Sequence, residues 1–134
     1  LKRAARYKHA FSLVFLDLDY FKGFNDRHGH LAGNKVLMDI AGIVKNNIRT
    51  VDIAARYGGD EFVIILPETD GKGARVAMDK LRRKILDYTF RGDAVTVSGG
   101  IAAFPDDGKS EEKLISKADQ RLYTAKAKGR DQIL

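Results

Sequence analysis

The sequence contains no cysteine and no tryptophan, and it has only two prolines. Without cysteine the chain forms no disulfide, offers no thiolate to a metal ion and carries no thiol nucleophile. This absence is compatible with a reducing compartment, and we expect a cytoplasmic location. The expectation leaves open a membrane anchor elsewhere in a parent protein.

Long apolar runs are also missing. No run approaches the roughly 20 residues that cross a bilayer, and no secretory signal pattern is visible. The 134 residues, of which 44% are hydrophobic and 31% charged, fit one globular domain. The chain begins at Leu1 rather than Met, so we expect residues 1–134 to be a single domain excised from a larger protein.

Acidic residues are outnumbered by basic ones, which gives a net charge of +6. A basic surface favours anionic partners such as nucleotides, nucleic acids or an acidic membrane surface. The sequence has no basic stripe with interleaved aromatic residues, so we expect no nucleic-acid partner. A mildly basic, solvated surface is the alternative interpretation of this charge.

The chain is organised around a Gly58-Gly59 pair between two apolar runs, Ile53–Ala55 and Phe62–Leu66. Such a pair predicts a β-hairpin with a two-residue turn, because these turns need positive φ angles. Asp60 and Glu61 would then open the second strand with their side chains on opposite faces. Acids at a buried strand require a cation or hydrogen-bond donors; the alternative is an exposed turn.

The first strand is predicted over Phe11–Leu16, a continuous apolar run typical of a buried central strand. Asp17 and Asp19 follow at its carboxyl end, where enzymes of mixed α and β structure commonly place ligand groups. For Asp17 we favour a metal-ligand role. For Asp19 we favour capping of the following turn, Tyr20–Asn25.

Apolar residues at helical spacing predict a helix from Ala32 to Arg49. A second helix is expected after Asp70, and a third from about Ser110 to a stop at Gly129.

The polar loop before the first helix holds His28 and His30. No third soft ligand is close in sequence, so loop packing is favoured over metal binding for these two histidines.

A further strand is expected over Val95–Phe104, interrupted by Gly99-Gly100. The resulting order is strand, helix, hairpin, helix, strand, helix, which predicts an α+β fold with helices packed on a mixed sheet. In this arrangement the end of the first strand lies beside the hairpin turn. Asp17 and Asp60 would then meet.

Two carboxylates and a backbone carbonyl such as that of Leu18 form a hard oxygen site suited to Mg²⁺ or Mn²⁺. Lys126 and Arg130 are four residues apart, so on one helical face they could neutralise a triphosphate. A metal, phosphate-binding bases and no nucleophilic side chain indicate phosphoryl or nucleotidyl transfer by positioning and electrostatics.

These motifs together resemble the GGDEF domains, the diguanylate cyclases of bacterial signalling. The similarity extends over nearly the whole chain, and each segment alone would be weak. The matching segments, in order, are residues 17–22, 25–26, 29–30, 58–62, Ser98, Gly100, 118–119, 122–126 and 129–130.

The resemblance implies a ferredoxin-like core of the nucleotidyl-cyclase and polymerase-palm kind, with the GGDEF segment as a β-hairpin. It implies that each subunit of a homodimer binds one GTP with two Mg²⁺ (or Mn²⁺) ions, and that each 3′-hydroxyl attacks the other nucleotide's α-phosphate. The products would be cyclic di-GMP and pyrophosphate.

The resemblance also assigns roles to residues. Asp17, the Leu18 carbonyl and Asp60 would hold metal, and Glu61 would support the metal site or the reacting hydroxyl. The backbone amides of Phe21 and Lys22, at a helix start, would bind the β- and γ-phosphates of the nucleotide. Lys126 and Arg130 would contact the same phosphates. Asn25 would bind the guanine edge, and Gly58 and Gly59 would also contact the nucleotide.

Two departures from the family pattern stand out. Asn34 occupies the position after Gly33 where the family usually has Asp, and an amide cannot accept from both guanine N–H donors as a carboxylate can. We therefore expect weaker discrimination against adenine, as in relatives that make a mixed cyclic GMP–AMP. The family's upstream DxLTxLxNR stretch is also missing.

A product-inhibition site of the form RxxD is expected in this family five residues before the GGDEF turn. Arg49 and Asp52 fit that spacing, and Lys80 on the next helix is expected to assist. A surface ion pair at a helix end is the alternative interpretation.

The leading hypothesis is therefore a diguanylate cyclase domain, controlled by a sensory or regulatory domain in its parent protein. The rival from another class is a GGDEF domain without turnover that serves as a receptor for GTP or cyclic di-GMP.

Overall fold

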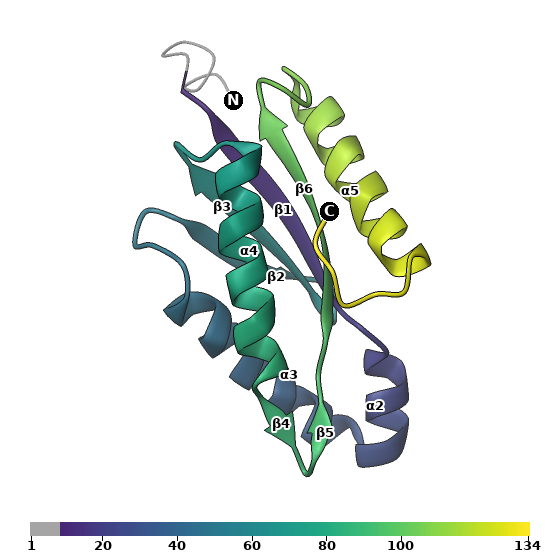
Figure 1. Ribbon diagram of the computed structural model, residues 1–134. Coiled ribbons are helices and arrows are strands. Elements are labelled where there is room, and N and C mark those ends of the chain that lie inside the picture. The colour runs from purple at the N-terminus through teal and green to yellow at the C-terminus, as the bar shows by residue number, and fades with distance from the viewer. Residues whose placement is uncertain (1–8) are drawn as a thin grey trace.

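The computed structural model describes residues 9–134, which form a four-stranded sheet with helices on both faces (Figure 1). In the described part, no helix is both long and apolar enough to cross a membrane. The elements in chain order are β1 (Phe11–Leu18), α2 (Phe21–His28), α3 (His30–Asn46), β2 (Ile53–Tyr57), β3 (Glu61–Pro67), α4 (Gly71–Leu86), β4 (Thr89–Phe90), β5 (Asp93–Ala94), β6 (Val97–Phe104) and α5 (Glu111–Ala127).

The sheet has the order β2-β3-β1-β6, so β1 is a central strand, as its apolar run predicts. The α+β class with helices on the sheet is confirmed. All three strand pairings are antiparallel, however, where a mixed sheet was expected. Between residues 9 and 134, parallel pairing is limited to one isolated bridge between Gly99 and Ile133.

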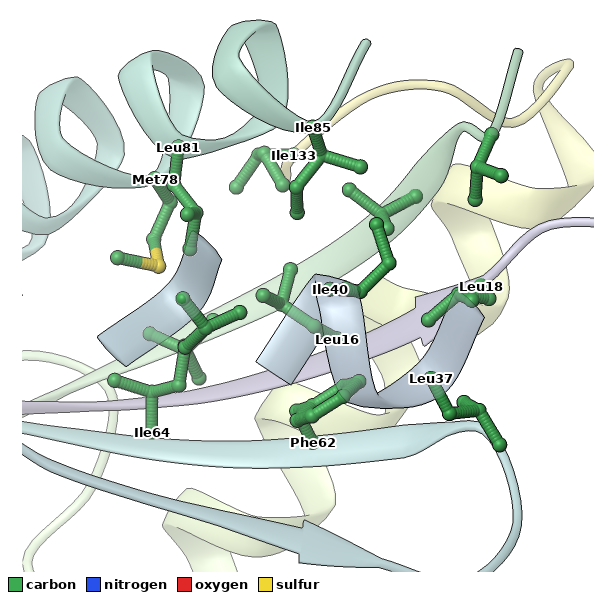
Figure 2. Packing of buried hydrophobic residues seen from close by; sticks show 14 of the residues in the cluster. Leu16, Leu18, Leu37, Ile40, Phe62, Ile64, Met78, Leu81, Ile85 and Ile133 are labelled. Carbon is green, nitrogen blue, oxygen red and sulfur yellow. The ribbon is translucent and has the colours of Figure 1, made fainter. Parts of the chain in front are cut away.

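Alternation along β1 divides the core into two layers. Val14, Leu16 and Leu18 belong to the larger cluster, which is covered by α3 and α4 and seen in Figure 2. Leu13 belongs to the smaller cluster under α5. Because successive strand residues point to opposite faces, Asp17 belongs with Leu13 on the α5 face. The side chain of Asp17 is therefore within reach of α5 and not of α3 or α4.

Strand β6 is unbroken, and every one of its residues is buried. The expected interruption at Gly99-Gly100 is therefore wrong. A Cβ added at Gly100 would overlap the Ala118 carbonyl oxygen and the Leu122 nitrogen of α5. The glycines do not break the strand; Gly100 lets the backbone of α5 lie directly against it.

Gly100→Ala is expected to lower the free energy of unfolding by about 2–3 kcal/mol, because the added methyl group must displace helix backbone. Urea denaturation measures the change. Gly42→Ala is the matched control, since in the described structure nothing lies within 4 Å of a Cβ there. In the middle of α3 that change should stabilise by about 0.5–1 kcal/mol. Equal effects at both positions would contradict the packing argument.

Local boundaries differ from the prediction mainly around α2 and α3. The turn expected over Tyr20–Asn25 is a helix that runs to His28, and α3 begins at His30 and ends at Asn46. The small β4–β5 hairpin was not anticipated, because two-residue strands carry no periodic signal. The later helices begin after Asp70 and Ser110 as expected, and both side chains cap them.

Candidate functional site

The hairpin turn contains three residues, Gly58, Gly59 and Asp60, because Tyr57 pairs with Glu61 across it. The predicted two-residue turn is therefore wrong, and Asp60 lies in the loop rather than in β3. Of the two glycines, Gly58 has a positive φ, 74°. Glu61 opens β3 opposite Asp17 of β1, so both acids lie on the α5 face.

The turn packs beside the end of β1. The Leu18 amide donates to the Asp60 carbonyl oxygen at 3.1 Å, and the Asp60 carboxylate interacts with that of Asp17. The prediction that Asp17 and Asp60 meet is confirmed.

Asp17 is the buried centre of this site, with a side chain that is 6% exposed. Lys126 of α5 donates from Nζ to Oδ2 of this carboxylate. The other oxygen, Oδ1, is buried and accepts no hydrogen bond from residues 9–134. The site therefore holds one orphaned acceptor atom beside a second acid.

The pKa of Asp17 is raised from its ordinary value of 3.8 to about 6: burial is the largest cause, the hydrogen bond from Lys126 opposes it, and the charge of Asp60 adds to it. A divalent cation would reverse both raising effects, because it stabilises the ionised carboxylates. In the described chain, no three His, Cys, Asp or Glu side chains are placed so that they could hold a metal ion by themselves. The orphaned Oδ1 of Asp17 and the neighbouring Asp60 carboxylate are the kind of oxygen that Mg²⁺ prefers, so the two acids fit such an ion if water and substrate complete its coordination.

Helix α2 begins beside this acidic centre. Its N-cap residue, Tyr20, has a left-handed φ of 57°, and in the described structure no side chain caps the helix. The first helical amides are those of Phe21 and Lys22, and the positive end of the helix dipole favours an anion there.

Arg130 lies over the same helix start. Its guanidinium carbon is 4.5 Å from the centroid of the Tyr20 ring, and Nη1 is 3.4 Å from the Tyr20 hydroxyl. Because α5 ends at Ala127, Arg130 does not share a helical face with Lys126, and that prediction is wrong. A chain reversal after the helix brings the two cations to the same end of the sheet.

Asp19 does not cap α2, and the N-cap interpretation is wrong. Its buried carboxylate accepts from the hydroxyls of Thr96 and Ser98, each at 2.7 Å, and from the amide of Asp131 at 3.0 Å. These donors lie just before β6 (Thr96), within it (Ser98) and after α5 (Asp131), and they hold the carboxylate away from the helix amides. These hydrogen bonds could not be predicted from a local sequence pattern, because the donors lie 77 to 112 residues after Asp19.

Asn25 of α2 lies against Gly33 of α3. Asn25 Oδ1 is buried without a hydrogen-bond partner among the described residues, and a Cβ at Gly33 would overlap it. Asn34 is the next residue along α3 and is exposed. Asn34 therefore follows directly after the residue that Asn25 contacts.

His28 packs against its neighbours, as expected. Its ring lies against Phe24, with the two centroids 4.5 Å apart, and Nε2 is 2.6 Å from an Asp93 carboxylate oxygen. His30 begins α3 and is exposed.

A second candidate site lies at the end of α3, where Arg49 and Asp52 form an ion pair. Arg49 Nη2 is 2.7 Å from Asp52 Oδ1, and the Arg49 amide is 2.7 Å from Oδ2. The pair borders a groove of about 630 Å³ between α3 and β2, which Lys45 and Arg56 also line. Lys80 lies on α4 and is not among the described residues that line this groove.

The fold and the acidic centre at the hairpin define the class of protein. The chain belongs to the GGDEF family: residues 1–132 match the family described as diguanylate cyclase, GGDEF domain.

Two curated proteins of this family are similar to the chain in sequence. The chain is 43% identical to diguanylate cyclase DgcP of Pseudomonas aeruginosa over 90% of its own length, and 35% identical to diguanylate cyclase A of Treponema denticola over 94%. It spans only 18% and 35% of those two proteins.

Among solved structures, the GGDEF domain of DgcB from Caulobacter crescentus, in complex with c-di-GMP, superposes with a TM-score of 0.91 at 31% identity. That match covers 98% of this chain and 81% of the DgcB chain. The active GGEEF domain of a diguanylate cyclase from Vibrio cholerae superposes with a TM-score of 0.93 at 28% identity, over 98% and 86% of the two chains.

Proposed function

We propose that this chain is a catalytic domain that condenses two GTP molecules into cyclic di-GMP and two pyrophosphates. The observation that carries the proposal is the convergence of Asp17 and Asp60 from separate segments, with Glu61 on the same face and Lys126 in contact. The names of the relatives support the same activity. One active site holds one GTP, so the reaction requires a homodimer with two sites facing each other.

The proposed metal site consists of Asp17, Asp60 and the Leu18 carbonyl, with Glu61 beside it. Two bound Mg²⁺ or Mn²⁺ ions would polarise the α-phosphate and favour ionisation of the attacking 3′-hydroxyl. The orphaned Oδ1 of Asp17 supports this assignment, because it is a buried acceptor with no donor from residues 9–134.

The phosphates are assigned to the start of α2. Amides of Phe21 and Lys22 would donate to the β- and γ-phosphates, and the turn glycines Gly58 and Gly59 would lie against the nucleotide. Arg130 already lies over Tyr20 at this helix start, which supports a role in neutralising the triphosphate. Lys126 would act at the same phosphates from its position beside Asp17.

The base is assigned to the junction of α2 and α3, at Asn25 and Asn34. Asn34 offers one acceptor oxygen where a carboxylate would offer two, so adenine should be rejected weakly. A mixed cyclic GMP–AMP product is therefore the alternative outcome of the same chemistry.

A regulatory partner is part of the proposal, because the chain spans a minor share of its curated relatives. We place the domain in the cytoplasm, where GTP is made and used, under the control of a sensory domain elsewhere in a parent protein. Nucleic acid is not a proposed partner.

The deciding experiment is incubation with Mg²⁺ and GTP, ATP or both, followed by identification of the products. Cyclic di-GMP with stoichiometric pyrophosphate supports the proposal. GTP binding without pyrophosphate release would indicate a receptor and would overturn the catalytic assignment.

Product inhibition is proposed at Arg49 and Asp52, with Lys80 contributing from α4. Arg49→Ala should weaken inhibition by added cyclic di-GMP about tenfold or more, because a charge-assisted, forked contact is lost. The initial rate should stay close to that of the wild type, since Asp52 keeps its 2.7 Å bond to the backbone amide of residue 49.

Initial-rate assays over a range of cyclic di-GMP concentrations measure this effect. Arg83→Ala, an exposed arginine on α4, is the control and should leave inhibition unchanged. If cyclic di-GMP inhibits the Arg49 variant as strongly as the wild type, Arg49 and Asp52 form a surface ion pair and not an inhibition site.

A further inference from the structure

The chain after α5 adopts an unusual backbone where it passes the proposed phosphate site. Arg130 and Asp131 both have left-handed φ angles, 65° and 48°, and neither is glycine. A left-handed backbone at a residue other than glycine is strained, and it persists where the surroundings hold it. Figure 1 shows this tail turning back from the end of α5 to run beside β6.

Asp131 is held from two sides. Its amide donates to the buried carboxylate of Asp19 at 3.0 Å, at the end of β1. Its own carboxylate accepts from Arg82 of α4, with 2.9 Å between Asp131 Oδ1 and Arg82 Nη1. The Arg82 side chain is 19% exposed and that of Asp131 39%, so this contact is partly shielded from water.

The two contacts of Asp131 also restrain the preceding residue, Arg130, because the two residues share a peptide bond. The Arg130 guanidinium stacks over Tyr20 at the start of α2. We propose that Asp131 and Arg82 are positioning residues, which hold Arg130 over the amides that bind the β- and γ-phosphates. The inference rests on the proposed function and adds two residues that act through Arg130 without touching the nucleotide.

The alternative is that the ion pair merely stabilises the fold. The two roles differ in how Asp131 and Arg130 combine. If Asp131 acts through Arg130, substituting Asp131 should no longer lower the affinity for the nucleotide once Arg130 has been changed to alanine. A purely structural residue would weaken binding in either background.

The test is a double-mutant cycle on the full 134-residue chain. Asp131→Gly removes the carboxylate but tolerates the left-handed backbone, and Asp131→Asn keeps an acceptor oxygen and also tolerates that backbone. Each change is made with and without Arg130→Ala. Calorimetry with Mg²⁺ measures the affinity for a GTP analogue with a methylene bridge between its α- and β-phosphates.

Asp131→Gly is expected to weaken analogue binding about tenfold with Arg130 present and less than about twofold with Arg130→Ala, and Asp131→Asn should retain most of the affinity. GMP lacks the outer phosphates, so its binding should be unchanged in every variant. Equal losses in both backgrounds, or no loss in either, would overturn the inference.

The proposed function fails separately from this inference. If Arg130→Ala itself binds the analogue like the wild type, the phosphate role of Arg130 is wrong and the inference falls with it. If Arg130→Ala weakens binding but the Asp131 effect is additive, only the positioning role is wrong.

Arg82→Met provides a second approach should the Asp131 variants fold poorly. It keeps the apolar stem of the arginine and removes the other half of the ion pair. The same dependence on Arg130 is expected, and its absence in a folded Arg82 variant would also overturn the inference. Circular dichroism establishes folding before each titration.

Discussion

Asp17→Asn is expected to abolish turnover and, in the absence of metal, to make the protein more stable at neutral pH. Loss of activity follows from loss of a carboxylate that would hold a divalent cation, a defect of about a thousandfold or more. The gain in stability follows from the environment of Asp17. Function and stability place opposite demands on this side chain.

The sign of the stability change follows from the raised pKa. Asp17 titrates near its ordinary 3.8 in the unfolded chain and at about 6 in the folded protein, so folding favours the protonated form. Its contribution is fully favourable below pH 4 and is lost as the pH rises to about 6. A rise in pKa from 3.8 to about 6 corresponds to about 3 kcal/mol, which is the cost that asparagine avoids at pH 7.5.

Urea denaturation without divalent ions, at pH 4 and at pH 7.5, measures this prediction. The variant should gain about 2–3 kcal/mol at pH 7.5 and less than about 1 kcal/mol at pH 4, where Asp17 is protonated in the folded protein and only partly ionised in the unfolded chain. Added Mg²⁺ should stabilise the wild type but not the variant, because only the wild type binds the ion. A variant less stable than the wild type at pH 7.5 would contradict the raised pKa.

Asp39→Asn is the matched control. Hydrogen bonds from Lys35 and Tyr88 lower the pKa of Asp39, so its ionised form is favoured in the folded state. The same chemical change should therefore destabilise at pH 7.5. An equal response of both variants would show that the effect is not specific to the acidic centre.

Asn34→Asp is expected to increase the preference for GTP over ATP by about ten- to a hundredfold. A carboxylate can accept from both guanine N–H donors, and adenine presents no such pair at its edge. Values of kcat/KM for the two nucleotides, measured separately and in competition, give the ratio. The mixed product should decline as cyclic di-GMP rises.

Asn46→Asp adds the same charge at the far end of α3, about 18 Å from residue 34 along the helix axis. It should leave nucleotide preference unchanged. If both variants shift the preference equally, long-range charge rather than contact with the base controls selectivity. If neither does, Asn34 does not contact the base edge.

Sequence periodicity was sufficient to predict most of the secondary structure. The apolar run of β1 and the helical spacing of α3 are local patterns, so they survive in the fold. Their boundaries moved by a few residues, and α2 was taken for a turn because its eight residues are too few to show a helical period.

The meeting of Asp17 and Asp60 was also predictable, because a hairpin and a central strand leave few ways to arrange their ends. Contacts between distant segments were not. Asp19 finds its donors in Thr96, Ser98 and Asp131, and Arg130 reaches Tyr20 only after the chain reverses. Such contacts depend on tertiary packing, which no local pattern encodes.

The alternation of side chains along β1 has a consequence for how this domain can change. Deleting or inserting one residue within the strand would move each later side chain of β1 to the opposite face of the sheet. Asp17 would then face hydrocarbon under α3 and α4, and Lys126 could not follow it. Substitutions within β1 can be absorbed by repacking, but its length cannot vary, so gains and losses of residues in descendants of this sequence should fall in the connecting loops.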